Sequence, residues 1–150
     1  MSNSNSLTSA EVRILHELQG VLFDAPGVLP AARGMSHFGE HALGWMGIAG
    51  AGAAVDKRRR RKWLAMGAGA FTAHAASVVL KRIVRRRRPD DPSVRVGVGT
   101  PSKLSFPSSH ATSTSAAMVH LADITGSKLP YAGIPIMMTS RMVLGVHYPT

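Results

Sequence analysis

The stretch WLAMGAGAFTAHAASVVL, residues 63–80, runs for 18 residues without a Lys, Arg, Asp or Glu. Because an α-helix rises about 1.5 Å per residue, a helix of this length nearly crosses the ~30 Å hydrocarbon core of a bilayer. Basic clusters flank it on both sides, KRRRRK at 57–62 and KRIVRRRR at 81–88. Such clusters commonly anchor the ends of a membrane helix at the head-group level. The stretch therefore predicts a membrane-spanning helix.

Three further apolar segments cover residues 41–55, 111–124 and 131–146. They almost lack the polar stripes that the helices of a soluble bundle carry. Segments 41–55 and 63–80 are rich in Gly and Ala, and small residues let membrane helices approach closely. The pattern predicts an all-α, multi-pass transmembrane bundle of about five helices.

The N-terminal third is more polar. Residues 1–6, MSNSNS, predict a disordered leader without the basic region and cleavage site of a signal peptide. Residues 8–23 predict an amphipathic helix, with Thr8 and Glu11 as a capping box. This helix would lie at the membrane interface, pack against the bundle or cover an ordinary surface. The Pro and Gly residues of 24–39 predict a loop, and residues 7–150 form a single membrane domain.

Charge is distributed unevenly along the chain. The net charge is +10, but the two basic clusters hold 12 of the 18 Lys and Arg residues. Aromatic residues are few and the clusters flank apolar helices, so we expect no nucleic-acid partner. The clusters carry equal basic charge, so the positive-inside rule does not choose an orientation. The absence of Cys excludes disulfides, thiolate nucleophiles and Cys-based zinc sites.

The second basic cluster contains the first candidate anion site. On a helix, Lys81 and Arg88 would share one face about 10 Å apart along the axis, before Pro89 ends the helix. Arg matches phosphate oxygens with a planar fork, and Lys adds a point charge. The alternative is a juxtamembrane patch that binds anionic lipid head groups.

The sequence FPSSH, residues 106–110, contains the second candidate site. Ser108 or Ser109 would cap a helix whose first backbone N–H groups can bind phosphate. His110 would lie in the first turn, where it could exchange protons near neutral pH. The alternative is a plain capped helix with an interfacial His.

The sequence SRMVLGVHYPT, residues 140–150, contains the third. Arg141 lies beside an apolar run, where a charge is costly and suggests function. His147 follows six residues later, so the two side chains would converge only through a bend or helix end, to which Gly145 could contribute. The alternative is a snorkelling Arg and a boundary His.

The order of the three motifs resembles the signature of the type 2 phosphatidic acid phosphatase superfamily, whose motifs match residues 81–150. The resemblance implies that Lys81, Arg88 and Arg141 hold phosphate oxygens together with Ser108 and the backbone around Ser109. It implies that His147 attacks phosphorus to form a phosphohistidine and that His110 protonates the leaving oxygen. No metal or other cofactor is required, because the three cations neutralise the phosphate.

The resemblance also implies a lipid phosphate substrate and a site on the extracytoplasmic face of the bacterial plasma membrane. The short chain and Arg-rich first motif are similar to short actinobacterial members, some of which act on polyprenyl-phospho-sugars such as decaprenylphosphoryl-phosphoribose. Phosphatidic acid would use the same site. The basic clusters would contact anionic membrane lipids.

Two features depart from the family pattern. Ser109 stands where the family usually has Gly, which places a side chain near the phosphate. The family pattern continues with an Asp four residues after His147, beyond Thr150, and with a final helix. We therefore expect this 150-residue form to lack the last helix and to be much less active than a complete homologue. The alternative function is an inactive membrane protein that binds anionic lipids.

Overall fold

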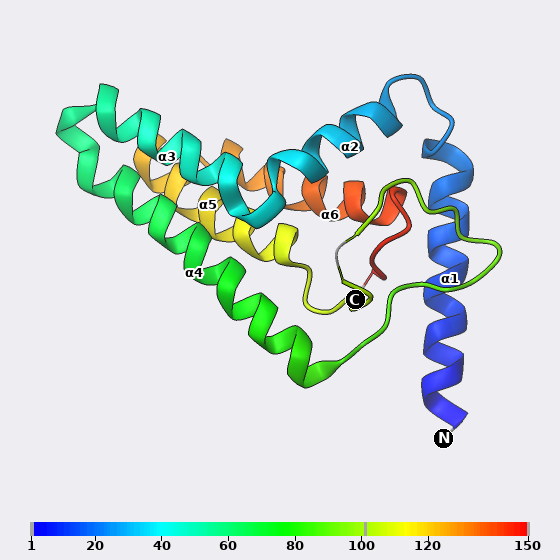
Figure 1. Ribbon diagram of the computed structural model, residues 1–150. Coiled ribbons are helices and arrows are strands. Elements are labelled where there is room, and N and C mark those ends of the chain that lie inside the picture. Colours follow the sequence, from blue (N-terminus) through cyan, green and yellow to red (C-terminus); the bar gives the residue numbers. More distant parts are fainter. Residues whose placement is uncertain (1, 101, 150) are drawn as a thin grey trace.

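The computed structural model describes residues 2–100 and 102–149, and Figure 1 shows an all-helical chain. The α-helices are α1 (Ser2–Leu22), α2 (Val28–Phe38), α3 (Leu43–Val55), α4 (Arg60–Val84), α5 (Ser109–Thr125) and α6 (Gly133–Val143). The short 3-10 turns η1 (Glu40–Ala42), η2 (Lys57–Arg59) and η3 (Leu129–Ala132) precede α3, α4 and α6. The β structure in the described residues is one isolated bridge, between Arg87 and Leu104. The predicted all-α class is confirmed.

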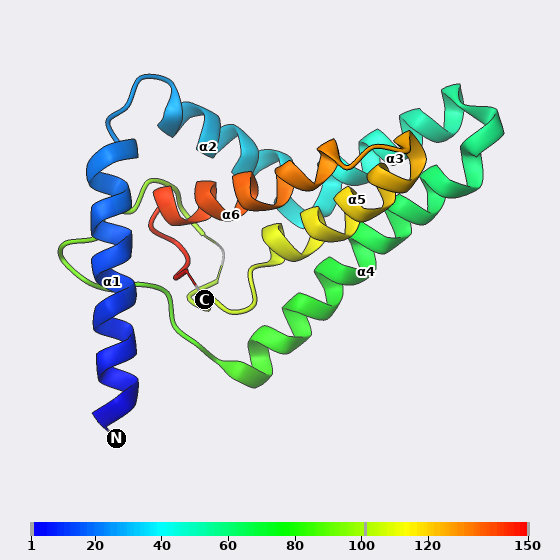
Figure 2. The same ribbon diagram turned by 180° about the vertical axis from the view of Figure 1, so that it is seen from behind.

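Four helices form the bundle. In Figures 1 and 2, α3, α4, α5 and α6 run alongside one another, and α4 packs most extensively on α5 and α3. Small residues permit this approach, as the sequence predicts. A Cβ at Gly52 would lie 2.3 Å from the Trp63 ring, and one at Gly69 would lie 2.9 Å from His120 Nε2. Helices α3 and α5 therefore pack closely against α4.

Helix α4 carries the strongest membrane signal. Among the described residues, one helical stretch, Lys57–Val84, is long and apolar enough to cross a bilayer. Only 17% of its most apolar window is buried inside the protein. Its apolar side chains Leu64 and Phe71 are each more than half exposed. A core helix of a soluble protein would bury these side chains, so the exposed surface fits a hydrocarbon surrounding.

In the N-terminal region, the structure differs from three predictions. Helix α1 begins at Ser2, so residues 2–6 extend the helix instead of forming a leader, and Met1 lies outside the described residues. An existing helix is extended at little cost per residue. Thr8 is therefore not an N-cap, and Glu11 forms an ion pair with Arg86. Residues 28–38 form α2 instead of a loop, because Gly27 adopts a left-handed φ of 78° before the helix and Pro30 falls in its first turn.

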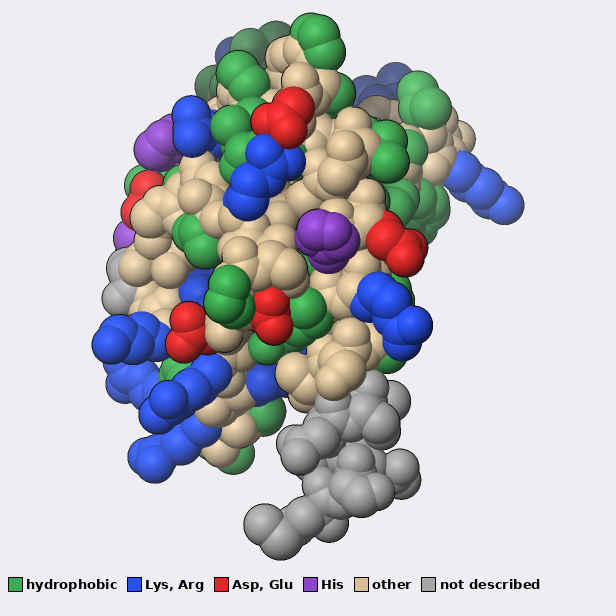
Figure 3. All heavy atoms as spheres, turned by 90° about the vertical axis from the view of Figure 1, so that its right-hand side faces the viewer, with side chains coloured by type: hydrophobic (Ala, Val, Ile, Leu, Met, Phe, Trp, Pro, Cys, Tyr) green, Lys and Arg blue, Asp and Glu red, His purple; other side chains and the backbone are tan. Residues whose placement is uncertain are grey.

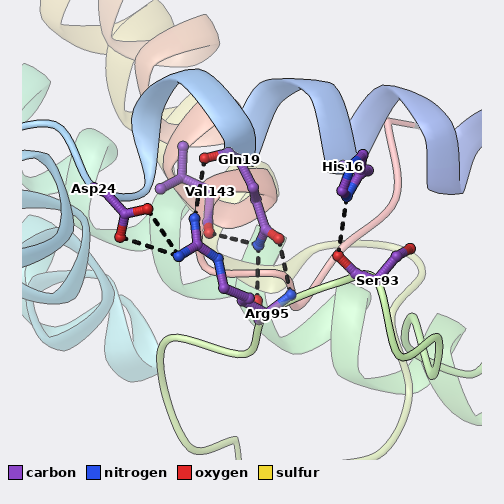
Figure 4. A network of polar contacts seen from close by, with 6 residues as sticks. All are labelled: His16, Gln19, Asp24, Ser93, Arg95 and Val143. Carbon is purple, nitrogen blue, oxygen red and sulfur yellow. Dashed lines mark hydrogen bonds and ion pairs between the residues drawn. The ribbon is translucent and has the colours of Figure 1, made fainter.

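Gln19 of α1 joins three distant segments of the chain (Figure 4). Its Nε2 donates to the carbonyl oxygens of Arg95 at 2.7 Å and Val143 at 2.9 Å, and its Oε1 accepts from the Arg95 N–H at 2.9 Å. The Arg95 guanidinium in turn pairs with the Asp24 carboxylate. Gln19 is 2% exposed, so these groups have little access to water. The side chain thus fixes the loop between α4 and α5 against the end of α6.

We expect Gln19→Ala to lower the free energy of unfolding by about 1–3 kcal/mol, because it leaves buried backbone groups without partners. Glu17→Ala, at an exposed position on the same helix, serves as the control and should change stability by less than about 0.5 kcal/mol. Thermal unfolding of the detergent-solubilised protein measures both. Equal stability of the two variants would contradict the anchoring role of Gln19.

Candidate active site

Three cations from different elements converge at one end of the bundle. Lys81 lies in the last turn of α4, Arg88 in the following loop and Arg141 near the end of α6. All three line one cavity of about 490 Å³, together with Ser109 and His110. Lys81 is 9% exposed and Arg141 only 2%. The fold therefore buries two positive charges, and the half-buried Arg88 adds a third to the same cavity.

Arg88 reaches this cavity by a different route from the one predicted. Helix α4 ends at Val84, and Arg85 adopts a left-handed φ of 55°, so Lys81 and Arg88 do not share a helix face. The chain after Arg85 instead runs beside residues 103–105, and the Arg88 N–H donates to the carbonyl oxygen of Lys103 at 3.0 Å. Arg88 Nε donates to the Ser102 carbonyl at 2.8 Å. Backbone carbonyls thus hold the guanidinium in place.

Arg141 and His110 are both held by Ser36 of α2. Arg141 Nη1 donates to Ser36 Oγ at 2.7 Å, and His110 Nε2 lies 2.9 Å from the Ser36 carbonyl oxygen. A carbonyl only accepts, so His110 Nε2 carries a proton and Nδ1 remains available for exchange. Ser36 was not among the predicted site residues. Residues 24–39 read as a loop, and nothing in the local sequence connects Ser36 with motifs 74 and 105 residues away.

The start of α5 matches the prediction. Ser108 is the N-cap, and its Oγ accepts from the Ala111 N–H at 3.3 Å. His110 lies in the first turn of the helix. Ser109 Oγ, which the sequence places near the phosphate, accepts a hydrogen bond from Ser77 Oγ at 2.7 Å. The Ser109 hydroxyl is therefore engaged with α4, although the residue still lines the cavity.

His147 follows the bend that the sequence requires. Helix α6 ends at Val143, and Gly145 has a left-handed φ of 66°. The imidazole lines a second cavity of about 390 Å³ with Ser108 and Arg141, so Arg141 borders both cavities. Arg88 Nη1 lies 3.2 Å from His147 Nε2 and donates to the Val146 carbonyl at 2.5 Å. The six-residue step between Arg141 and His147 thus brings both side chains to one site.

The charge state of His147 suits a nucleophile. Burial, assisted by the nearby Arg88 and Arg141 charges, lowers the pKa of His147 to about 2. A guanidinium only donates, so the neighbouring Nε2 carries a lone pair and the proton resides on Nδ1. Burial lowers the pKa of Arg88 to about 10, which leaves that guanidinium cationic at neutral pH. The site therefore places a neutral imidazole beside a positive charge.

Lys81, Arg88 and Arg141 have no ion-pair partner among residues 2–100 and 102–149. Glu40 lines the same cavity but is exposed and forms none of the described ion pairs. Arg141 Nε is buried and makes no hydrogen bond. Burying like charges without a counter-charge is costly unless an anion compensates them. The cavity is therefore built for an anionic ligand, and a tetrahedral phosphate matches its donors.

Comparison with known proteins places this arrangement in a family. The model of the PAP2 superfamily matches residues 62–150, which contain every predicted site residue. The chain belongs to the PAP2 superfamily. It is a membrane protein and a phosphatase of this superfamily, as the motifs predict.

The relatives are similar over most of the chain. A decaprenylphosphoryl-5-phosphoribose phosphatase from Mycolicibacterium smegmatis is 59% identical over 140 residues, which cover 93% of this chain and 78% of that protein. The protein of the same name from Mycobacterium tuberculosis is 55% identical over 140 residues, which cover 93% of this chain and 79% of that protein. The crystal structure of a transmembrane PAP2-type phosphatidylglycerolphosphate phosphatase from Bacillus subtilis has a TM-score of 0.73 at 24% identity, covering 97% of this chain and 76% of that one. This likeness shows the shared helical fold.

Gly145 provides a test of how this PAP2 protein positions His147. A Cβ at Gly145 would lie 2.1 Å from the Arg95 carbonyl oxygen, whereas Gly126, with a similar φ of 67°, faces open space. We expect Gly126→Ala to lower the free energy of unfolding by about 1–2 kcal/mol, because alanine disfavours the left-handed backbone conformation. Gly145→Ala should cost more and should lower phosphatase activity strongly, because the clash displaces the segment that carries His147. Thermal unfolding and phosphate release measure the two effects, and equal behaviour of the variants would contradict the close approach at Gly145.

Proposed function

We propose that the protein hydrolyses the terminal phosphomonoester of a membrane lipid phosphate, without a metal, through a phosphohistidine on His147. The observation that carries this proposal is the cluster of buried Lys81, buried Arg141 and half-buried Arg88, which forms no ion pair in the described chain. These cations neutralise the phosphate oxygens and stabilise the charge of the transition state. The adjacent imidazole supplies the nucleophile that phosphoryl transfer requires.

In the first step, His147 Nε2 attacks phosphorus. The P–N bond forms as the P–O bond to the alcohol breaks. The negative charge of the bound phosphate favours the doubly protonated form of His110, which gives its Nδ1 proton to the leaving oxygen. The 3.2 Å separation of His147 Nε2 and Arg88 Nη1 supports this direction of attack, because an oxygen bound to Arg88 would bring phosphorus close to the lone pair. The neutral form of His147 keeps that lone pair free of a proton at physiological pH. The Arg88 hydrogen bond to it passes to a phosphate oxygen when the substrate binds.

In the second step, water hydrolyses the phosphohistidine. His110 takes a proton from the water as the P–N bond breaks, and phosphate and neutral His147 are regenerated. The hydrogen bond from His110 Nε2 to the Ser36 carbonyl leaves His110 Nδ1 as the atom that exchanges the proton. Ser36 orients both His110 and Arg141, so α2 contributes to the geometry of each step.

The names of the relatives support a substrate class. Two proteins at 55–59% identity are named decaprenylphosphoryl-5-phosphoribose phosphatases. We infer that the substrate is a polyprenyl-phospho-sugar carrying a phosphomonoester. Phosphatidic acid-like lipids carry the same phosphomonoester group, which the cradle formed by Lys81, Arg88 and Arg141 would bind. Lys81 of the site lies at the opposite end of α4 from residues 57–62, about 32 Å from Arg60 along the helix axis. Placing residues 57–62 in the cytoplasm, against anionic lipids, puts the active site on the extracytoplasmic face.

The test is phosphate release from a lipid phosphate in detergent containing EDTA. We expect His147→Ala to abolish release and His110→Ala to reduce it by about 100-fold or more, since general acid–base catalysis contributes 10²–10⁴. His16→Ala, at an exposed position on α1, should retain wild-type activity. Unchanged release by His147→Ala would exclude the proposed nucleophile.

A further inference from the structure

A third cavity, lined mainly by basic residues, adjoins the cavity that Lys81, Arg88 and Arg141 line. Its volume is about 960 Å³, and four exposed cations line it: Arg82, Arg85, Arg87 and Lys103. We call this cavity the basic basin. Asp90 also lines it, so four positive charges face one carboxylate even before Arg88 is counted. None of these four cations takes part in the proposed chemistry.

The basin and the catalytic cavity share a wall. Arg82, Arg88, Thr100 and Leu104 line both cavities. Arg88 therefore stands between the basin on one side and the His147 imidazole on the other. A ligand that binds its terminal phosphate in the cradle would meet the basin with the part of the molecule that follows.

The basin cations differ from the other basic residues of their loop. Arg86 pairs with Glu11 and Arg95 pairs with Asp24, so each of these charges is balanced by an acid of α1 or of the turn after it. In the described part of the chain, no ion pair involves Arg82, Arg87 or Lys103. The acids near the loop thus neutralise its other cations and leave the basin positive.

The basin also lies next to an apolar surface. Val79, Leu80, Ile83 and Val84 of the last turns of α4 are between 46% and 70% exposed. Basic side chains directly beyond exposed apolar side chains mark the level at which a lipid changes from tail to head group. On the face in Figure 3, Lys and Arg side chains gather at the lower left, with acidic side chains along the upper border of the group. A lipid bound here could place its tail along α4 and its head-group phosphate in the basin.

We propose that the basic basin binds a second phosphate of the substrate, the phosphodiester that joins the polyprenyl chain to the sugar. This inference rests on the proposed function, in which a phospho-sugar on a polyprenyl phosphate carries both a phosphomonoester and a phosphodiester. The monoester enters the cradle of Lys81, Arg88 and Arg141, and the diester lies one sugar ring away, across the shared wall. The basin thereby distinguishes a polyprenyl-phospho-sugar from a lipid with a single phosphate.

The test compares two soluble sugar phosphates in detergent with EDTA. One is 5-phosphoribose that carries a short isoprenyl phosphodiester at C1, and the other is the methyl riboside of ribose 5-phosphate, which lacks the diester. The variant is Arg87→Gln/Lys103→Gln. The matched control is Arg58→Gln/Arg60→Gln, which removes two exposed cations from the opposite end of α4. The readout is the ratio of kcat/KM for the two substrates.

We expect the wild type and the control to prefer the diester substrate, and Arg87→Gln/Lys103→Gln to lower this preference by about tenfold, mainly through KM, since charge-assisted hydrogen bonds are lost. An unchanged preference would overturn the inference. A second arm repeats the assay in vesicles of anionic lipid. If Arg87→Gln/Lys103→Gln lowers the preference for the diester substrate only in these vesicles and not in detergent, the basin contacts the bilayer surface and the inference is overturned. If the wild type releases phosphate from neither substrate, the proposed function itself fails, which is distinguishable from failure of the basin alone.

Discussion

The structure depends on one electrostatic constraint, the convergence of two buried cations and one half-buried cation without an ion pair to balance them. Lys81 and Arg141 are almost fully buried, and Arg88 lies beside the same cavity. Neutral partners hold these groups, namely backbone carbonyls for Arg88 and the Ser36 hydroxyl for Arg141. Like charges repel and buried charges lose hydration, so bringing these three cations together raises the free energy of the folded protein. A phosphate relieves this cost, and the relief is the source of its affinity.

The remaining elements position the cradle. Helix α4 brings Lys81 to one end of the bundle, and the N-terminus of α5 supplies Ser108 and His110. Helix α1 acts at a distance, because Gln19 binds the carbonyl of Val143, just before the Gly145 bend, and the carbonyl of Arg95, which Gly145 approaches closely. This contact fixes the segment that carries His147. The polar N-terminal helix thus supports the nucleophile without touching the substrate.

Much of the site could be predicted from the sequence, and the limits have physical causes. The apolar segments and motifs predicted the bundle, the Ser108 cap and the convergence of Arg141 with His147 through a bend. The helical path between Lys81 and Arg88 was wrong, because α4 ends before the left-handed Arg85 and the chain then pairs with the segment 103–105. Helix α2 was missed because Pro26, Gly27, Pro30 and Gly34 suggested a loop. Pro26 and Gly27 precede the helix, Pro30 lies in its first turn, and only Gly34 falls in its interior, where one glycine costs a helix about 1 kcal/mol. Ser36 and Gln19 act through contacts between residues far apart in sequence, which local patterns do not report.

The most direct measurement is thermal unfolding of the wild type and Lys81→Met with and without vanadate, a phosphate analogue. Removing one of the three repelling charges with a side chain of similar shape should raise the Tm of the anion-free protein and should abolish most of the stabilisation by vanadate. Lys128→Met removes an exposed charge at the far end of the bundle and should change neither value. A lower anion-free Tm for Lys81→Met, with vanadate stabilisation intact, would contradict the account.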